Sequence, residues 1–368
     1  MSRVSKLGHN VLFVDPPINT GWVFMKHFLE GRWPLRRLLT QRYKDEKVEV
    51  LSPLNIHPVY SKLSVKHANR IDKLAKKIFD KKRKTILWVY HVEMLFLENY
   101  LRDINYDILV YDCVDNYEAF PAYKSEEKKK WISEQEKMLA TRANIVFATT
   151  PGLIEKLKKH NPNTYYTPNV GDYDRFFDIR KSKEEEPEKL REIPHPRVMF
   201  TGAIDEYKFD KELVKKIAMD FPSYSFVIIG PSAYKDRWVT EKALGFEDFN
   251  NIHFLGPVDY TKLPNYISKA DVLMIPYQLN DYTVGGCFPV KFHNYLASGY
   301  PVVVTDLPAY APFYEACYIS KDYNEFSQNI RKALEEESIS AIKKRQKVAS
   351  QNTWDQKVTK MLSLINKL

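Results

Sequence analysis

The sequence predicts an α/β protein made of two doubly wound, Rossmann-like domains that face a cleft. Short runs rich in Val, Ile and Phe alternate with longer amphipathic runs, which is the pattern of βαβ units and a parallel sheet. The chain has 368 residues, of which 44% are apolar, and this is enough for two domains with large cores. A charged segment with prolines, residues 180–196, divides the alternation into two halves and is expected to be a linker or an exposed loop.

The alternation is clearest in the second half of the chain. Strands are expected at residues 197–202, 224–230, 251–256, 271–277 and 301–306, with helices at 210–221, 236–246, 260–270 and after 289. The first three of these strands end at Gly202, Gly230 and Gly256. Glycines at the carboxyl ends of parallel strands let a ligand approach the backbone, and open α/β sheets bind their ligands at that edge.

The first half repeats this scheme less regularly. Strands are expected at residues 10–15, 86–91, 107–112 and 144–150, with a helix at 126–143. We therefore expect an N-terminal domain of residues 1–180 and a C-terminal domain of residues 181–352. A last helix within 353–368 is expected to pack back on the N-terminal domain.

Positive charge is concentrated near the start of the chain. The formal net charge is +9, and residues 1–100 hold 19 Lys and Arg against 9 Asp and Glu. This surplus indicates either an anionic partner for the first domain, such as nucleic acid, anionic lipid or an acidic substrate, or simply a soluble basic face. Residues 21–39 interleave aromatic and basic side chains in the manner of an interfacial amphipathic stretch, although a core helix followed by a basic loop fits as well. The membrane contacts expected there are Trp22, Phe24, Trp33, Arg36 and Arg37.

Cysteine usage and the apolar runs indicate the compartment. Cys113, Cys287 and Cys317 form no CxxC motif, so neither a disulfide framework nor a metal site is expected. The N-terminus does not fit a signal peptide, and no apolar run approaches the ~20 residues of a membrane span. We expect a cytoplasmic protein.

One segment of the second half has the features of an anion site. Gly285 and Gly286 precede Pro289, which suits the first turn of a helix, and Lys291. Consecutive glycines can present backbone N–H groups in a concave nest, and a helix N-terminus carries partial positive charge. A lysine so early in a helix is unfavourable unless an anion offsets it. The segment therefore predicts a bound phosphate or diphosphate, the alternative being a glycine loop beside a solvated lysine.

The same residues resemble a known family. The run "PVKFHNYLASGYPVVVTDLP", residues 289–308, is similar to the donor-binding segment of GT-B glycosyltransferases. The runs "FTGAIDEYKFDKELV", "SFVIIGP" and "NIHFLGPVDYTKLPNYISKADVLMIPY" match the family in the same order, as do "LVYDCVDNYEAF" and residues 145–177. The resemblance covers most of residues 85–310. It is closest to the bacterial cell-surface polysaccharide transferases of the teichuronic acid and xanthan glucuronosyltransferase type.

The resemblance implies a reaction and its partners. It implies transfer of a sugar from a nucleoside-diphosphate sugar, UDP-linked, to a membrane-anchored glycan or lipid. No metal or other cofactor and no nucleic acid are expected, and the protein would work at the inner face of the cell membrane in contact with anionic lipid. Two other interpretations stay open, a nucleotide-sugar epimerase of the same fold and a basic nucleic-acid-binding protein.

The resemblance also assigns donor-binding residues. Lys291 and the backbone of residues 284–287, including Gly285 and Gly286, would hold the diphosphate. Gly202 and Ala203 would let the strand edge approach it, and Lys208 would be a second cation or an inert surface lysine. The backbone near Val258 would read the nucleobase, and Tyr277 would bind the phosphates or pack on the sugar, unless it only packs at the strand end.

Two positions depart from the family pattern. The glutamate that usually contacts the donor ribose falls on Asn294, which can still donate and accept hydrogen bonds but is uncharged. Gly286 stands where the first glutamate of the paired-glutamate motif of retaining members would fall. The stereochemical outcome is therefore left open.

An inverting transferase needs a base that takes the proton of the acceptor hydroxyl. Asp112 and Asp115 follow a buried strand and are expected to face the cleft. Asp115 is the preferred catalytic residue, because Asp112 is better placed to support the turn. His91 is the alternative.

Overall fold

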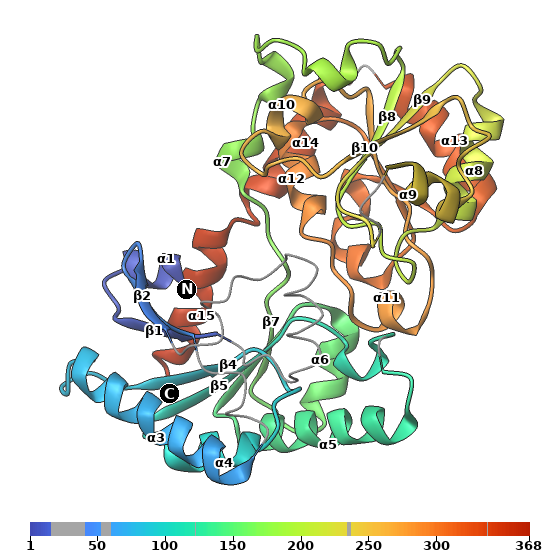
Figure 1. Ribbon diagram of the computed structural model, residues 1–368. Coiled ribbons are helices and arrows are strands. Elements are labelled where there is room, and N and C mark those ends of the chain that lie inside the picture. Colours follow the sequence, from blue (N-terminus) through green and yellow to red (C-terminus); the bar gives the residue numbers. More distant parts are fainter. Residues whose placement is uncertain (16–40, 53–59, 122, 234–236, 337) are drawn as a thin grey trace.

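The computed structural model describes residues 1–15, 41–52, 60–121, 123–233, 237–336 and 338–368, and they form two α/β domains (Figure 1). The predicted membrane contacts Trp22, Phe24, Trp33, Arg36 and Arg37 lie outside these residues. None of the helices in the described ranges combines the length and apolar character needed to cross a bilayer.

The C-terminal domain contains a six-stranded parallel sheet of order β10-β9-β8-β11-β12-β13. This order is that of the Rossmann fold, in which the direction of winding reverses between the first and fourth strands, here β8 and β11. The strands are β8 (Arg197–Thr201), β9 (Ser225–Ile229), β10 (Ile252–Gly256), β11 (Val272–Ile275), β12 (Val302–Thr305) and β13 (Tyr318–Ser320). Every residue of β8, β9, β11 and β12 is buried, which explains their continuous apolar runs.

Helices connect and cover these strands. They are α8 (Lys211–Asp220), α9 (Arg237–Leu244), α10 (Leu263–Ile267), α11 (Asp281–Gly286), α12 (Lys291–Ser298), α13 (Tyr323–Leu334) and α14 (Ile339–Ser350). The expected helix at 260–270 is shorter than predicted, and α11 was not expected.

The N-terminal domain is built on a four-stranded parallel sheet of order β4-β5-β6-β7. The strands are β4 (Ile86–Val89), β5 (Ile108–Cys113), β6 (Ile145–Ala148) and β7 (Thr164–Tyr166), and the helices are α3 (Ser61–Ile78), α4 (Leu97–Asp103), α5 (Glu126–Arg142) and α6 (Pro151–Lys158). A separate three-stranded sheet of order β1-β3-β2 lies beside it, with β1 (Val11–Val14), β2 (Gln41–Asp45) and β3 (Val48–Ser52), and α1 (Ser2–Lys6) precedes it. Leu51 of β3 and Tyr100 of α4 share a core cluster with the buried face of α3.

The C-terminal helix α15 (Trp354–Ile365) lies in the N-terminal domain (Figure 1). Its buried Met361 and Ile365 pack against Val110 of β5 and Phe147 of β6. The chain therefore crosses between the domains twice, and the crossings lie side by side: Gly171 pairs with Thr353, and its N–H donates to the carbonyl of Asn352 at 3.2 Å.

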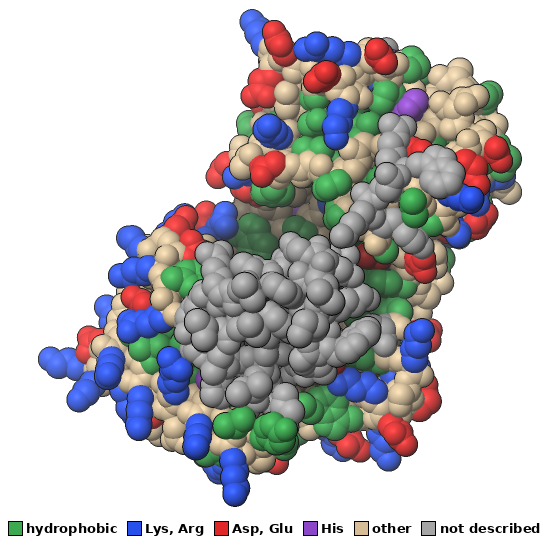
Figure 2. Space-filling view, viewed as in Figure 1, with side chains coloured by type: hydrophobic (Ala, Val, Ile, Leu, Met, Phe, Trp, Pro, Cys, Tyr) green, Lys and Arg blue, Asp and Glu red, His purple; other side chains and the backbone are tan. Residues whose placement is uncertain are grey.

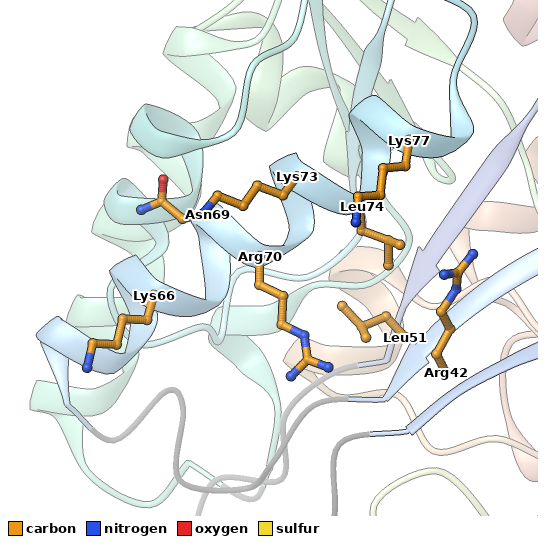
Figure 3. A pocket seen from close by; sticks show the side chains of 8 residues that line it. All are labelled: Arg42, Leu51, Lys66, Asn69, Arg70, Lys73, Leu74 and Lys77. Carbon is orange, nitrogen blue, oxygen red and sulfur yellow. The ribbon is translucent and has the colours of Figure 1, made fainter.

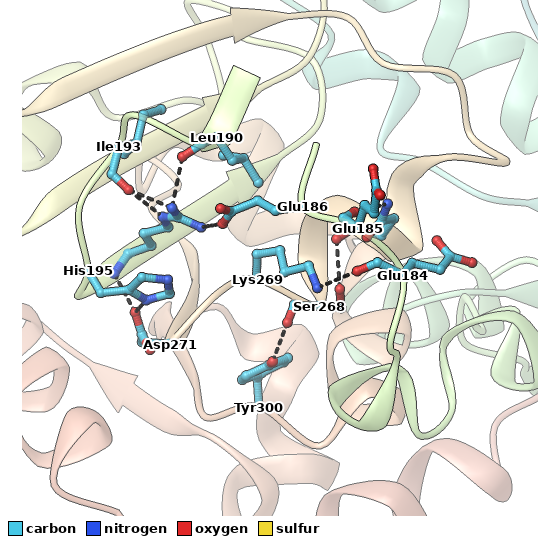
Figure 4. A network of polar contacts seen from close by, with 12 residues as sticks. Glu184, Glu185, Glu186, Leu190, Ile193, His195, Ser268, Lys269, Asp271 and Tyr300 are labelled. Atoms are coloured by element: carbon cyan, nitrogen blue, oxygen red, sulfur yellow. Dashed lines mark hydrogen bonds and ion pairs between the residues drawn. The ribbon is translucent and has the colours of Figure 1, made fainter. Parts of the chain in front are cut away.

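Residues 180–196, expected to be a linker or an exposed loop, are held on the C-terminal domain (Figure 4). Arg197, a buried residue of β8, donates to the carbonyl oxygens of Leu190 and Ile193 and pairs with Glu186. Asp271 accepts a hydrogen bond from the backbone N–H of Arg197 and lies 2.6 Å from Nδ1 of His195. Most residues of this segment are exposed, as predicted for a loop, and the buried guanidinium of Arg197 holds the segment on the domain.

Candidate functional site

The candidate site lies at the carboxyl ends of β8 and β11, where the winding of the C-terminal sheet reverses. Gly202 follows β8 with φ +142°, a conformation that favours glycine. A Cβ at this position would collide with Nζ of Lys291, so the glycine is needed for the lysine side chain to cross the strand end. Open α/β sheets bind their ligands at this kind of edge.

Lys291, the first residue of α12, is the central cation of the site. Its ammonium donates to the hydroxyl of Tyr277 at 2.9 Å and lies 4.2 Å from the ring centroid of Phe200. Burial, and next the positive charge of Lys208, lower the pKa of Lys291 to about 7. A bound anion would favour the charged form, so the site has the electrostatics expected of an anion-binding site.

Lys208 is a second cation near Lys291. Its ammonium forms an ion pair with Asp205 at 2.8 Å. Burial lowers the pKa of Lys208, but the contact with Asp205 outweighs burial and the pKa lies above its usual value. Ala203, half-buried, precedes this loop.

Tyr277 is buried at the end of β11. Its backbone N–H donates to the hydroxyl of Thr305 at 3.1 Å, and Phe209 forms a β-bridge with it. The hydroxyl of Tyr277 holds Lys291, so its observed role is to orient the lysine. Val258 lies in the loop after β10, half-buried against the core, and no further contact there bears on a nucleobase.

The expected nest at Gly285 and Gly286 is corrected by the structure: the two glycines end helix α11. Asn280 caps this helix, accepting hydrogen bonds from the N–H groups of Tyr282 and Thr283 at 3.1 and 3.0 Å. The glycines allow a close approach between domains, since a Cβ on Gly286 would lie 2.7 Å from Cβ of Asn116. Of the predicted anion site, Lys291 and the N-terminal end of α12 therefore remain, without the glycine nest.

Asn294 is buried on α12 and contacts the first crossing between the domains. Its Oδ1 accepts a hydrogen bond from the backbone N–H of Asp172 at 2.8 Å. Its side chain also acts to lower the pKa of Tyr260, which burial raises. The side-chain oxygen of Asn294 is thus engaged within the chain.

Asp115 joins the two domains. Its Oδ1 accepts a hydrogen bond from the hydroxyl of Tyr282 on α11 at 2.9 Å, and Asn116 contacts the carbonyl of Asp281 at 3.5 Å. Burial raises the pKa of the Asp115 carboxyl, while Tyr282 and Lys208 act in the opposite direction. A carboxyl group with a raised pKa near the positive charge of Lys208 has the properties of a general base.

The other candidates for the base lie apart from this contact. Asp112, expected to face the cleft, is buried in β5; its carboxylate accepts from Trp88 Nε1 at 3.2 Å, and the nearby charge of Lys357 from α15 acts on it. His91 lies 4.0 Å from Glu93 with its ring 5.0 Å from that of Tyr117, and burial lowers its pKa.

The aromatic residues that border the site next to α11 were not predicted from the sequence. Tyr282, Phe120 and Tyr207 form an aromatic cluster across the domains, with ring centroids 5.4 to 5.7 Å apart. Asp205 was missed as well. The run "NDYTVGG" could have indicated helix α11, because Asn280 and Thr283 have the spacing of a capping box. In the described ranges, no group of three or more His, Cys, Asp or Glu side chains could hold a metal ion.

Comparisons with known proteins show what this chain is similar to. Residues 195–336 match the family model described as "Glycosyl transferases group 1". A curated relative, "Putative teichuronic acid biosynthesis glycosyltransferase TuaH" of Bacillus subtilis (strain 168), is 26% identical over 220 residues, which are 56% of this chain and 52% of the relative. The chain thus matches about half the length of that relative.

Solved structures share the fold over nearly the whole chain. Sucrose-phosphate synthase from Thermosynechococcus elongatus has a TM-score of 0.71 at 16% identity, covering 99% of this chain and 90% of its own. HepE of Anabaena in complex with UDP has a TM-score of 0.62 at 14% identity, covering 96% and 99%. The predicted fold of two Rossmann-like domains and the resemblance to GT-B glycosyltransferases are both confirmed.

Proposed function

We propose that the protein is a glycosyltransferase that moves a sugar from a nucleoside-diphosphate sugar, UDP-linked, to an acceptor hydroxyl. One observation carries the proposal: Lys291, with a pKa lowered to about 7, lies between Gly202 and Tyr277 at the reversal point of a Rossmann sheet. The match of residues 195–336 to group 1 glycosyl transferases covers these positions, and HepE has been solved with UDP on the same fold.

In this proposal, the C-terminal domain stabilises the leaving group. The diphosphate would meet Lys291, the N-terminal end of α12 and the Gly202–Ala203 backbone, with Lys208 as a second cation. Positive charge placed in advance where negative charge develops stabilises the transition state without reorganisation. No metal is included, because the two lysines can supply the positive charge.

The N-terminal domain would supply the base. Asp115 lies beside α11 and is held by Tyr282. In an inverting reaction it would accept the proton of the attacking hydroxyl.

In the C-terminal domain, Asp205 would release Lys208 when the diphosphate arrives. The Asp205 carboxylate and the diphosphate compete for the same Lys208 ammonium.

We further propose a membrane-anchored glycan or lipid as acceptor, in cell-surface polysaccharide synthesis at the inner face of the cell membrane. The relative from Bacillus subtilis is named for teichuronic acid biosynthesis, which supports an acceptor of this class. The basic surplus of the first 100 residues supports contact with anionic lipid there.

The test is a screen of nucleotide sugars for thermal stabilisation, followed by product analysis with the best donor. A ligand that binds only the folded state raises apparent stability, by about 2.7 kcal/mol at a hundredfold excess over Kd. Lys291→Ala should abolish the shift, and Lys332→Ala, on an exposed position of α13, should keep it. If no nucleotide sugar or nucleoside diphosphate stabilises the wild-type protein, the proposal is wrong.

A further inference from the structure

Helix α3 carries a stripe of exposed cations along one face. The stripe consists of Lys62, Lys66, Arg70, Lys73 and Lys77. Spacings of three and four residues place neighbours on the same side of a helix, and fifteen residues extend over about 22 Å. In Figure 2, Lys and Arg side chains gather at the lower left of the molecule, where Figure 1 places α3.

The described part of the chain supplies no counter-charge to the stripe. Among the described residues, none of its five cations has an ion-pair or hydrogen-bond partner. The acidic residue of α3, Asp72, lies on the buried face and accepts hydrogen bonds from Lys76 at 2.6 Å and from the N–H of Asn105 at 3.0 Å. Like charges at these spacings destabilise a helix, so the stripe has no benefit to folding and is explained better by an external anion.

A groove runs along the stripe. It has a volume of about 670 Å³ and is lined by Arg42, Leu51, Lys66, Asn69, Arg70, Lys73, Leu74 and Lys77. Figure 3 shows Leu74 and Leu51 between the helix and the strands, with Arg70 and Arg42 on either side. The groove therefore has an apolar floor between cationic walls.

We propose that this stripe, with Arg42, is the surface through which the protein binds an anionic phospholipid membrane. The inference deepens the proposed function and rests on it, because a membrane-anchored acceptor requires the enzyme to reach a lipid surface. It assigns the contact to helix α3, whereas the sequence analysis expected it at residues 21–39.

Two observations favour lipid over an acidic glycan or nucleic acid as the partner. Four of the five cations are lysines, which act as mobile point charges, whereas recognition of a defined carboxylate or phosphate favours the arginine fork. The groove lining contains no aromatic ring on which a base would stack.

The experiment compares two triple variants that lose the same charge. Lys66→Gln with Arg70→Gln and Lys73→Gln removes the centre of the stripe, and Lys332→Gln with Lys343→Gln and Lys347→Gln removes three exposed cations from α13 and α14. Binding is measured by co-sedimentation with vesicles of phosphatidylcholine plus phosphatidylglycerol, and with phosphatidylcholine alone. We expect the stripe variant to bind the anionic vesicles about a hundredfold more weakly, since each of the three basic residues near an anionic surface contributes about a fivefold factor. The control variant should stay within about threefold of wild type.

Further measurements separate this inference from the proposed function. UDP affinity, by calorimetry without vesicles, should be the same in wild type and in both variants. If the wild-type protein binds UDP but does not bind anionic vesicles, the assignment of the membrane surface is wrong. The same follows if both triple variants lose vesicle binding equally. Neither result would contradict the proposed UDP site. Lys66→Arg with Lys73→Arg keeps the charge and should keep vesicle binding; its loss would overturn the inference. Heparin and single-stranded DNA are tested at the same salt concentration, and tighter binding of either would overturn the assignment to lipid.

Discussion

At the scale of single residues, Lys291 is the central cation of the candidate site. Its side chain lies over Gly202 and against Tyr277. Burial and Lys208 lower its pKa to about 7, so part of the population is uncharged at neutral pH. A lysine in this state gains most from an arriving diphosphate.

The first prediction is that UDP binding takes up a proton. The anion favours protonated Lys291, so the affinity should fall as pH rises above about 7, by up to roughly a hundredfold near pH 9. Calorimetry in buffers of different ionisation enthalpy would measure the uptake. Lys291→Met should bind weakly and without this pH dependence. An equal slope in wild type and variant would show that another group titrates.

The second prediction concerns Asp115 and Tyr282. If the reaction inverts, Asp115→Asn should lower the rate at least ~10²-fold with UDP affinity nearly unchanged. The Tyr282 hydroxyl favours the carboxylate, so Tyr282→Phe should raise the pKa of Asp115 and move the acidic limb of kcat/KM to higher pH, by about one unit. The pH profile and the anomeric configuration of the product are measured together. An active Asp115→Asn enzyme that makes an inverted product would move the assignment to His91 or Asp112.

At the scale of elements, α11 and α12 set the geometry of the site. Helix α11 ends in two glycines, and the second lets Asn116 approach within contact distance. The cap by Asn280 and packing against the N-terminal domain override the low helix propensity of glycine. A helix of this composition therefore forms only in its tertiary context.

The third prediction is that Gly286→Ala separates the two domains locally. The added Cβ would lie 2.8 Å from the backbone nitrogen of Asn116, which cannot move away as a flexible side chain would. We expect kcat/KM to fall between about ten- and a hundredfold through displacement of Asp115. UDP affinity and the thermal midpoint should change little, because Lys291 is untouched and alanine is a good helix former. Val284→Ala, at an exposed position of α11, is the control. A fully active Gly286→Ala enzyme would mean that this contact is absent during turnover.

The strands and helices also show which parts of the structure could be predicted from local sequence patterns. All nine strands predicted from apolar runs are present. Six of them, β5, β6, β8, β9, β11 and β12, are buried along their whole length, which explains their continuous apolar runs. The missed strands include β7 and β13, which have three residues each and present no usable pattern. Lys291 could be singled out because its signal, a glycine pair, a proline and a lysine, is local. The bond from Asp115 to Tyr282 joins residues 167 positions apart, and no local pattern specifies such a pair.

At the scale of the whole molecule, two chain crossings hold the domains together. Gly171 and Thr353 pair side by side, and Asn294 of α12 accepts from the N–H of Asp172 next to them. A Cβ on Gly171 would lie 2.7 Å from Oδ1 of Asn294, so this crossing also needs a glycine. Asn294, which falls at the position of the ribose-binding glutamate in the family that this chain resembles, thus links helix α12 to the first chain crossing between the domains.

The last prediction tests which of these roles Asn294 has. If it holds the crossing, Asn294→Ala should lower the free energy of unfolding by about 1–3 kcal/mol, the usual cost of a buried donor left without its partner. The Kd values of UDP and of pyrophosphate should then change by the same small factor, because neither ligand loses a direct contact. Denaturant titration measures the stability, and calorimetry with both ligands measures the affinities. If UDP weakens tenfold or more while pyrophosphate does not, Asn294 contacts the nucleoside. In that case the donor must displace the N–H of Asp172, and binding would loosen the connection between the domains.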